Sequence, residues 1–188
     1  MSVFLALDLD EPKPPGATAL GGNSVRHEVM SLTQSHRKTV DAKWLPAEKL
    51  HLTLVFLGNP DVDAVRSLMS GTGDARSLSL QLRGAGTFKT ARAPSVLWLD
   101  VGGELEKLHA LQSTMRQRLG VEERQPYKPH VTLARAHSGE NALDPIAAEY
   151  ARFESSPFSV THLTLYESTH HRFSVLHRVV LSSSHVHW

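Results

Sequence analysis

The chain has 188 residues, of which 40% are hydrophobic and 21% charged, with a formal net charge of +1. This length and composition suit one globular domain with a sizeable core. The near-neutral charge argues against a long basic surface for duplex nucleic acid, and the absence of cysteine excludes disulfides and thiolate metal sites. Because no segment approaches the ~20 apolar residues of a membrane span, and residues 3–9 are too short for a signal peptide, we expect a cytoplasmic protein.

Strands and helices alternate along the first part of the chain. Compact apolar runs predict strands at residues 3–9 and 50–58. Proline and glycine predict a loop at 10–23. Helical periodicity, weak in the first case and clear in the second, predicts helices at 24–38 and 62–69.

The second part of the chain repeats this alternation. We expect strands at residues 78–84, 95–101 and 130–136. The most regular apolar stripe in the sequence predicts a helix over 105–119, which Gly120 ends. Residues 158–168 and 173–181 are expected to form a closing hairpin.

A faint internal repeat runs through this order. The strand at 3–9 leads through a helix to the strand at 50–58, and the strand at 95–101 leads through a helix to the strand at 130–136. Asp8 and Asp100 fall at matching places. The repeat predicts two similar lobes, which bring the last strand of each half to opposite sides of a cleft.

The strands at 50–58 and 130–136, which end the two halves of the repeat, each carry a His-x-Thr triplet. Side chains alternate along a strand, so His51 shares a face with Thr53, and His130 shares a face with Thr132. A pair of imidazoles that titrate near ~6.5 can supply one neutral base and one protonated acid near neutral pH. Hydroxyl groups can donate hydrogen bonds to anionic oxygens. Two such units that face each other are suited to in-line attack at a phosphodiester.

The triplet by itself is weak evidence. With 12 histidines in the chain, chance alone gives about two His-x-Ser/Thr triplets, and three are present. The third is His162-Leu163-Thr164. We expect a structural role for His162, because it follows Phe158 and Val160 in the middle of a predicted strand.

The wider context distinguishes the first two triplets from the third. The phrases "KWLPAEKLHLTLVFLG" and "YKPHVTLAR", with "VLWLDV" between them and "LTLYES" after them, resemble the two-histidine (2H) phosphoesterase superfamily. The most similar branch is that of the RNA 2′,3′-cyclic phosphodiesterases, also called 2′-5′ RNA ligases. The resemblance runs from Val3 to Leu181. It implies an α+β fold in one bilobal domain (1–188), with two antiparallel β-sheets that line a central cleft and helices packed on the outside.

The resemblance also implies an activity. It is the hydrolysis of 2′,3′-cyclic phosphate ends to 2′-phosphates, on RNA or nucleotides, without a metal ion or other cofactor. By position, His51 and His130 correspond to the catalytic histidines, and Thr53 and Thr132 to the substrate-binding threonines. In the family pattern the first histidine is the acid toward the 3′-oxygen, and the second activates water. We expect a monomer that does not bind membranes.

Four further residues have two interpretations each. Arg135 matches the arginine that the family pattern places five residues after the second histidine. Strict alternation puts it on the face opposite His130, whereas a bulge or the strand end can turn it toward the phosphate; the alternative is a structural salt bridge. Phe56, Tyr127 and Trp44 are candidates either for stacking on a base or for the core.

The chain departs from the family pattern in its loop at 10–23, which is long, and in its C-terminal "SSSHVHW". The pairs His170/His171 and His185/His187 are expected at the surface, because a metal site needs a further ligand that the sequence does not offer.

Two alternative functions remain open. One is RNA joining at the same site. The other is a non-catalytic module that binds nucleotides or RNA ends, although binding alone does not need two titrating groups.

Overall fold

The computed structural model describes residues 2–10, 24–72, 75–90, 93–139, 141–169 and 172–182. The order of the elements is β1 (Ser2–Asp8), α1 (Val25–Thr33), α2 (His36–Thr39), β2 (Ala42–Trp44), the 3₁₀ turn η1 (Ala47–Lys49), β3 (His51–Gly58), α3 (Val62–Ser70), β4 (Leu78–Thr90), β5 (Ala93–Gly103), α4 (Leu105–Arg118), β6 (His130–Ala136), α5 (Asp144–Glu149), the 3₁₀ turn η2 (Tyr150–Arg152), β7 (Phe158–Val160), β8 (His162–Ser168) and β9 (Phe173–Val180). None of the helices in these ranges is long and apolar enough to span a membrane.

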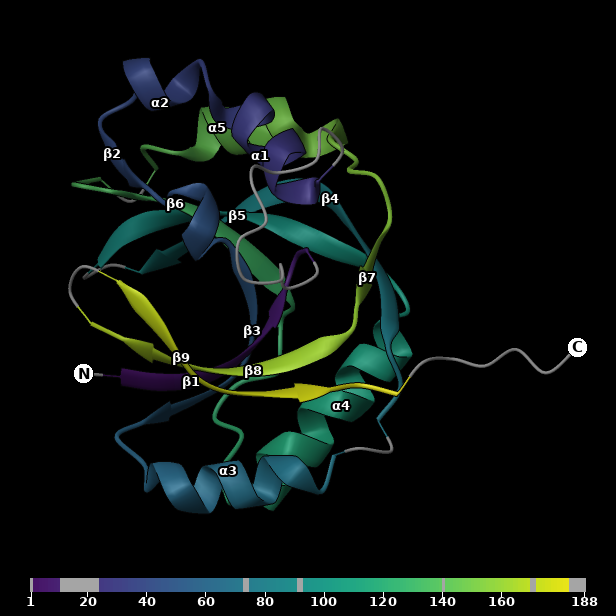
Figure 1. Cartoon of the computed structure of the whole chain (residues 1–188). Coiled ribbons are helices and arrows are strands. Elements are labelled where there is room, and N and C mark those ends of the chain that lie inside the picture. The colour runs from purple at the N-terminus through teal and green to yellow at the C-terminus, as the bar shows by residue number, and fades with distance from the viewer. Residues whose placement is uncertain are drawn as a thin grey trace, which may run out of the picture.

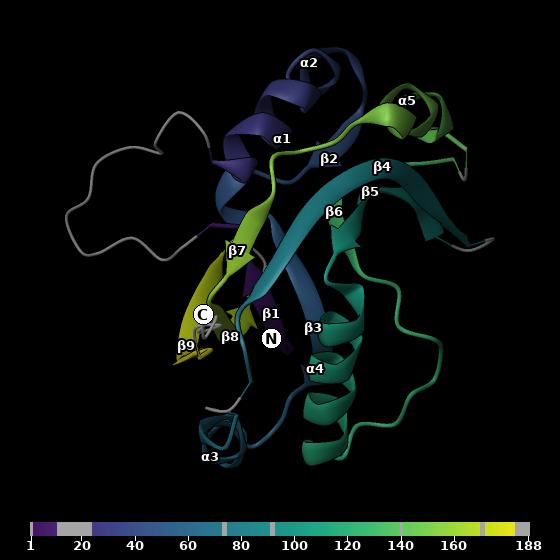
Figure 2. The same ribbon diagram turned by 90° about the vertical axis from the view of Figure 1, so that its right-hand side faces the viewer.

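The strands form one antiparallel path in the order β7-β4-β5-β6-β3-β1-β8-β9, and β2 pairs with β6. Only Thr161 separates β7 from β8 in the sequence, yet these strands lie near opposite ends of the path. The sheet therefore curls strongly (Figure 1). Helices α1, α2 and α5 lie at one end of it, and α3 and α4 lie at the other (Figure 2). The expected α+β class with outer helices is confirmed.

Where the prediction had two sheets, the structure joins them into one nine-stranded sheet, of which they are the two halves. They meet at β3 and β6, whose ladder consists of the single residue pair Leu52 and Val131. The internal repeat is visible in the pairing. Asp8 of β1 lies opposite His51 of β3, and Asp100 of β5 lies opposite His130 of β6.

Several element boundaries differ from the prediction. The helix expected at 24–38 is split into α1 and α2, and the Thr33 hydroxyl at the end of α1 donates to the Val29 carbonyl instead of pointing to solvent (2.9 Å). Strands β4 and β5 are longer than expected because they pair along nearly their whole length. The strand expected at 158–168 is broken at Thr161, while the β8–β9 hairpin is confirmed. The short elements β2 and α5 had no clear pattern in the sequence.

Helices α3 and α4 form where the apolar stripes predicted them. Asp61 caps α3 as a side-chain acceptor for the Asp63 and Ala64 amides. Leu108, Leu111 and Met115 of α4 are buried in the core. The segment 11–23 and the histidines at 170, 171, 185 and 187 lie outside the described residues.

Candidate active site

The structure brings the two histidine triplets to one cavity of about 480 Å³. His51 and Thr53 line it from β3, and His130 and Thr132 line it from β6. The alternate side chains of both strands, Leu52, Leu54, Val131 and Leu133, are buried on the opposite face. The core thus holds both triplets in place, as strand alternation predicts.

The two imidazoles have the same orientation. Nδ1 of His51 donates to the Lys49 carbonyl, and Nδ1 of His130 donates to the Lys128 carbonyl, each at 2.7 Å. A carbonyl oxygen can only accept, so Nδ1 carries the hydrogen in both rings. In the neutral rings, Nε2 therefore keeps its lone pair available for proton transfer.

Aromatic rings surround His51. Its ring centroid lies 4.9 Å from that of Phe4 and 5.2 Å from that of Phe173. Burial lowers the pKa of His51 to about 4, although its bond to the Lys49 carbonyl acts in the opposite direction. The imidazole of His51 is consequently neutral at pH 7.

His130 has a related but more polar environment. Its ring meets Phe88 edge-on at 4.8 Å. Beside it, the Lys128 ammonium binds both carboxylate oxygens of Asp100 at 2.8 and 2.9 Å and lies over the Trp98 ring. Burial lowers the pKa of His130, and the positive charge of Lys128 adds to this effect.

The two aspartates of the internal repeat have different partners. Asp8 is buried, and it accepts hydrogen bonds from the Thr164 hydroxyl (2.9 Å) and the Tyr166 hydroxyl (2.5 Å). Asp100 instead pairs with Lys128 near the surface. Asp8 also lies 3.5 Å from the Arg178 guanidinium and 3.9 Å from that of Arg26. The negative charge of Asp8 raises the pKa of His51, but the positive charge of Arg26 lowers it by more, so the two together do not offset the effect of burial.

Arg135 lines the cavity together with His130, so the strict-alternation argument is wrong. The reason is a bulge in β6: Trp98 lies opposite Thr132, but the next residue of β5, Leu97, lies opposite Ala134. Leu133 is skipped, and every later side chain changes face. The bulge that the sequence left open as an alternative is present.

The same irregularity occurs at the matching place in β3. Ala6 lies opposite Thr53 and Leu5 lies opposite Val55, so Leu54 is skipped. Phe56 is thereby turned into the cavity, where its side chain is 66% exposed. It is a candidate for stacking and is not a core residue.

The other aromatic candidates do not line this cavity. Trp44 is half-buried in β2, and its indole N–H donates to the Val40 carbonyl (3.4 Å). Tyr127 donates its hydroxyl to the Thr53 carbonyl (2.9 Å), next to the cavity wall. His162 is also outside the cavity lining, and its Nδ1 lies 2.8 Å from the Thr161 hydroxyl.

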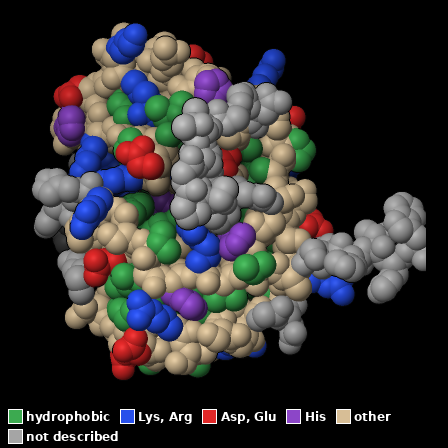
Figure 3. Space-filling model, in the orientation of Figure 1, with side chains coloured by type: hydrophobic (Ala, Val, Ile, Leu, Met, Phe, Trp, Pro, Cys, Tyr) green, Lys and Arg blue, Asp and Glu red, His purple; other side chains and the backbone are tan. Residues whose placement is uncertain are grey.

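Sequence reasoning missed several residues that line the cavity. Phe88 and Phe173 come from β4 and β9, which no motif connected to the histidines. Lys43 comes from the unpredicted strand β2, where it lies opposite Arg135. Figure 3 shows lysine and arginine side chains gathered on the side of the molecule where β2 and β6 lie in Figure 1. Lys43 and Arg135 make the cavity wall cationic on that side.

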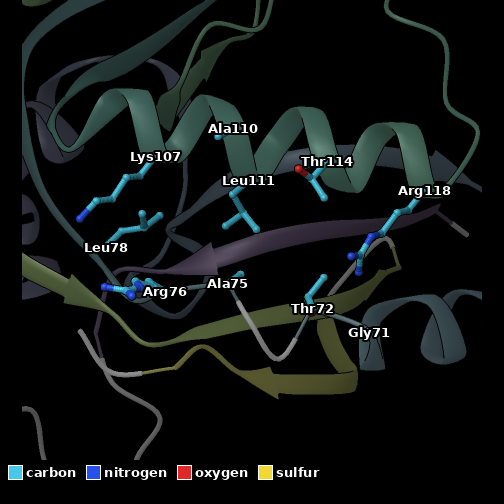
Figure 4. A pocket seen from close by; sticks show the side chains of 10 residues that line it. All are labelled: Gly71, Thr72, Ala75, Arg76, Leu78, Lys107, Ala110, Leu111, Thr114 and Arg118. Carbon is cyan, nitrogen blue, oxygen red and sulfur yellow. The ribbon is translucent and has the colours of Figure 1, made fainter. Parts of the chain in front are cut away.

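A second cavity, of about 400 Å³, lies between α4 and the segment that leads into β4 (Figure 4). It is lined by Gly71, Thr72, Ala75, Arg76, Leu78, Lys107, Ala110, Leu111, Thr114 and Arg118. Among the described residues, this lining has no histidine and no carboxylate, whereas the first cavity is lined by two histidines. Within the described ranges, no three histidine, aspartate or glutamate side chains gather as a metal site requires.

Comparisons of the sequence and of the fold with known proteins lead to one family. The model of the 2′-5′ RNA ligase superfamily matches residues 24–172. The RNA 2′,3′-cyclic phosphodiesterase of Methanocaldococcus jannaschii is 24% identical over 172 residues, which are 90% of this chain and 92% of that protein. That of Geobacillus stearothermophilus is 32% identical over 133 residues, 66% of this chain and 42% of that protein. The crystal structure of E. coli LigT complexed with 3′-AMP matches with a TM-score of 0.70 and 24% identity, over 96% of this chain and 98% of that one.

Proposed function

Because the chain belongs to the 2′-5′ RNA ligase superfamily, we propose that it is an RNA 2′,3′-cyclic phosphodiesterase that forms 2′-phosphate ends without a metal ion. The observation that carries the proposal is the pairing of the two triplets. Two imidazoles with the same fixed tautomer and two hydroxyls line one cavity. Relatives that cover most of this chain carry the same functional name.

The proposed reaction is an in-line displacement at the cyclic phosphate. One neutral imidazole takes a proton from a water molecule while the oxygen of that water attacks phosphorus. The other imidazole, protonated, gives its proton to the 3′-oxygen as the P–O3′ bond breaks. Each proton transfer contributes ~10²- to 10⁴-fold to the rate, which is useful without a Lewis acid. The hydroxyls of Thr53 and Thr132 donate to the non-bridging oxygens.

The two environments favour different roles for the histidines. Burial among aromatic rings makes His51 the harder of the two to protonate, which suits the base. We therefore assign the base to His51 and the acid to His130, the reverse of the division that the family pattern implies. A p-nitrophenolate leaving group needs no proton. On a nucleotide ester with that group, His130→Ala should retain much more activity than His51→Ala, and equal losses would contradict this assignment.

The rest of the cavity fits a nucleotide. Lys43 and Arg135 lie opposite each other on its wall. Their positive charges attract the anionic phosphate, and this attraction is stronger in a partly desolvated site than in water. Phe56 and Phe88 are large exposed rings on the same cavity, and rings of this kind stack on bases. Every side chain that this mechanism uses comes from one chain, so we propose that a single-domain monomer is active.

RNA joining is the second candidate, because the matched family is named for it. A 5′-hydroxyl would replace water as the attacking group at the same two histidines. A non-catalytic binding role would leave unexplained why both Nδ1 atoms are held so that both Nε2 atoms stay available.

Phosphorus NMR of a purified 2′,3′-cyclic nucleotide incubated with the protein tests the proposal. The expected result is replacement of the cyclic signal by that of the 2′-phosphate. Addition of an RNA with a 5′-hydroxyl end tests joining, which would replace the cyclic signal by that of a linear phosphodiester. An unchanged cyclic signal in both samples would contradict catalysis.

A further inference from the structure

We propose that a groove next to the cleft is a nucleobase subsite, which holds the base of the nucleotide that precedes the cyclic end of an RNA substrate. This inference rests on the proposed function and goes beyond it, because it makes oligonucleotides better substrates than mononucleotides. The base groove is lined by Leu54, Val55, Phe56, Gln112, Arg116, Gly120, Val121, Glu122, Glu123, Arg124, Gln125 and Tyr127.

The base groove adjoins the catalytic cavity at Phe56. Phe56 lines both, and its ring is mostly exposed. A hydrogen bond also links the two sites. The Tyr127 hydroxyl, in the groove lining, donates to the carbonyl of Thr53, which lines the cavity. Thr53 and Phe56 are three residues apart on a strand, or about 10 Å. A chain whose end lies at the histidines can therefore place its next base in the groove.

The groove exists because strands β3 and β6 separate. After their single pair, Leu52 with Val131, the two segments have no further ladder. The space beside β3 is bordered by α4 and by the segment that follows it. Its volume of about 670 Å³ lies within the ordinary range for ligand sites, ~300–1,000 Å³.

Gln112 is the observation that indicates a ligand. Its side chain is only 8% exposed, and it lines the base groove from α4. Its amide hydrogen-bonds to no other residue within the described part of the chain. The amide is open to the groove and is not among the fully buried polar atoms that lack a partner, so a ligand in the groove can replace water as its hydrogen-bond partner. An amide offers a donor and an acceptor side by side, and a nucleobase edge matches this pattern.

The charges of the base groove favour a base over a phosphate. Arg116 and Arg124 are balanced by Glu122 and Glu123, and Arg116 is already engaged with the Glu123 carboxylate (3.7 Å) and the Val121 carbonyl (3.1 Å). A neutral groove with aromatic and amide groups suits an uncharged, flat ligand. The phosphates remain with Lys43 and Arg135 in the cleft.

The test compares three substrates with the intact protein. They are a 2′,3′-cyclic mononucleotide, a trinucleotide that ends in the same cyclic nucleotide, and the same trinucleotide without its penultimate base. Stacking and base contacts are worth enough to raise kcat/KM of the full trinucleotide roughly tenfold over the mononucleotide. The abasic trinucleotide should lose this gain, because it keeps the phosphates but not the base.

Gln112→Leu should abolish the gain while turnover of the mononucleotide stays unchanged. The unfolding temperature should not fall, since leucine has a similar size and no amide to leave unpaired. The matched control is Gln117→Leu, on the same helix, whose amide is exposed and donates to the Ser113 hydroxyl (3.2 Å). It should keep the tenfold gain.

Equal turnover of the mononucleotide and the trinucleotide by the wild-type protein would overturn the inference and leave the proposed function intact. So would a gain that survives in Gln112→Leu or in the abasic substrate. If no substrate is turned over, the proposed function fails instead. The subsite is then tested by equilibrium binding of the corresponding 2′-phosphorylated products, for which the same tenfold ratio and the same dependence on Gln112 are expected. Equal affinities would overturn it.

Discussion

Phe56 and Arg135 occupy equivalent positions in the two halves of the cleft. Each follows a cavity-lining histidine by five residues, and each is turned into the cavity by a bulge that skips one leucine. The two halves are thus alike at their histidines and threonines and differ at this position. One side presents an aromatic ring and the other a cation, so the nucleotide substrate that we propose would have one preferred direction in the cleft.

The first prediction follows from this difference. Arg135→Gln should lower kcat/KM for a 2′,3′-cyclic nucleotide by roughly tenfold, because it removes a cation beside the phosphate that is worth about 1.5 kcal/mol. Steady-state kinetics at two salt concentrations measure the effect. The control is Arg66→Gln, a half-buried arginine on α3 that pairs with Asp63, donates to the Leu176 carbonyl and does not line the cavity. A kcat/KM equal to that of the control would mean that Arg135 has a structural role.

The position of the Arg135 side chain could not be predicted from strand alternation alone. The triplet residues could be placed from strand alternation, because the pattern of buried residues around them is regular. The bulge could not be predicted, since it depends on how β5 and β6 pair and not on a local propensity. The family pattern indicated the arginine, whereas alternation argued against it.

The parts of the fold that the sequence missed have a similar cause. Helix α4 was predictable from its own apolar stripe. Strand β2 has only three residues and is defined by its pairing with β6, and through it Lys43 enters the site. Gln112 has no motif at all, because its significance depends on the separation of two strands that are distant from it in the sequence. Contacts between distant segments determine these features.

The second prediction concerns the histidines. His51→Ala and His130→Ala should each lower kcat by a few orders of magnitude, because each removes one of the two proton-transfer groups. His162→Gln is the matched control, since His162 has the same triplet but does not line the cavity. It should stay within a few-fold of the wild-type rate. A loss in folded His162→Gln as large as that in His130→Ala would show that the wrong pair was assigned.

The third prediction separates the threonines from the histidines. Thr53→Ala and Thr132→Ala should each cost about 1.5–3 kcal/mol of transition-state stabilisation, the worth of a hydrogen bond to a charged group. Serine at either position should restore most of the activity, because it returns the hydroxyl. Single-turnover rates provide the measurement. Alanine variants with wild-type rates would exclude hydrogen bonds from these hydroxyls to the phosphate.

The fourth prediction links His51 to stability. Its pKa is about 4 in the folded protein and near the ordinary ~6.5 in the unfolded chain, so the unfolded chain takes up the proton first as the pH falls. Stability should therefore be lost between pH ~6.5 and pH 4, by up to about 3 kcal/mol from this group. Urea unfolding at pH 7 and pH 4.5 measures the difference. His51→Gln should show a smaller loss than wild type, and an equal loss would mean that His51 titrates normally.

Metal-independent turnover of a 2′,3′-cyclic nucleotide in EDTA tests the central claim most directly. With two histidines as the only proton-transfer groups, the rate should be the same with and without the chelator, and the product should be the 2′-phosphate. Activity that disappears in EDTA and returns with a divalent cation would contradict the two-histidine mechanism.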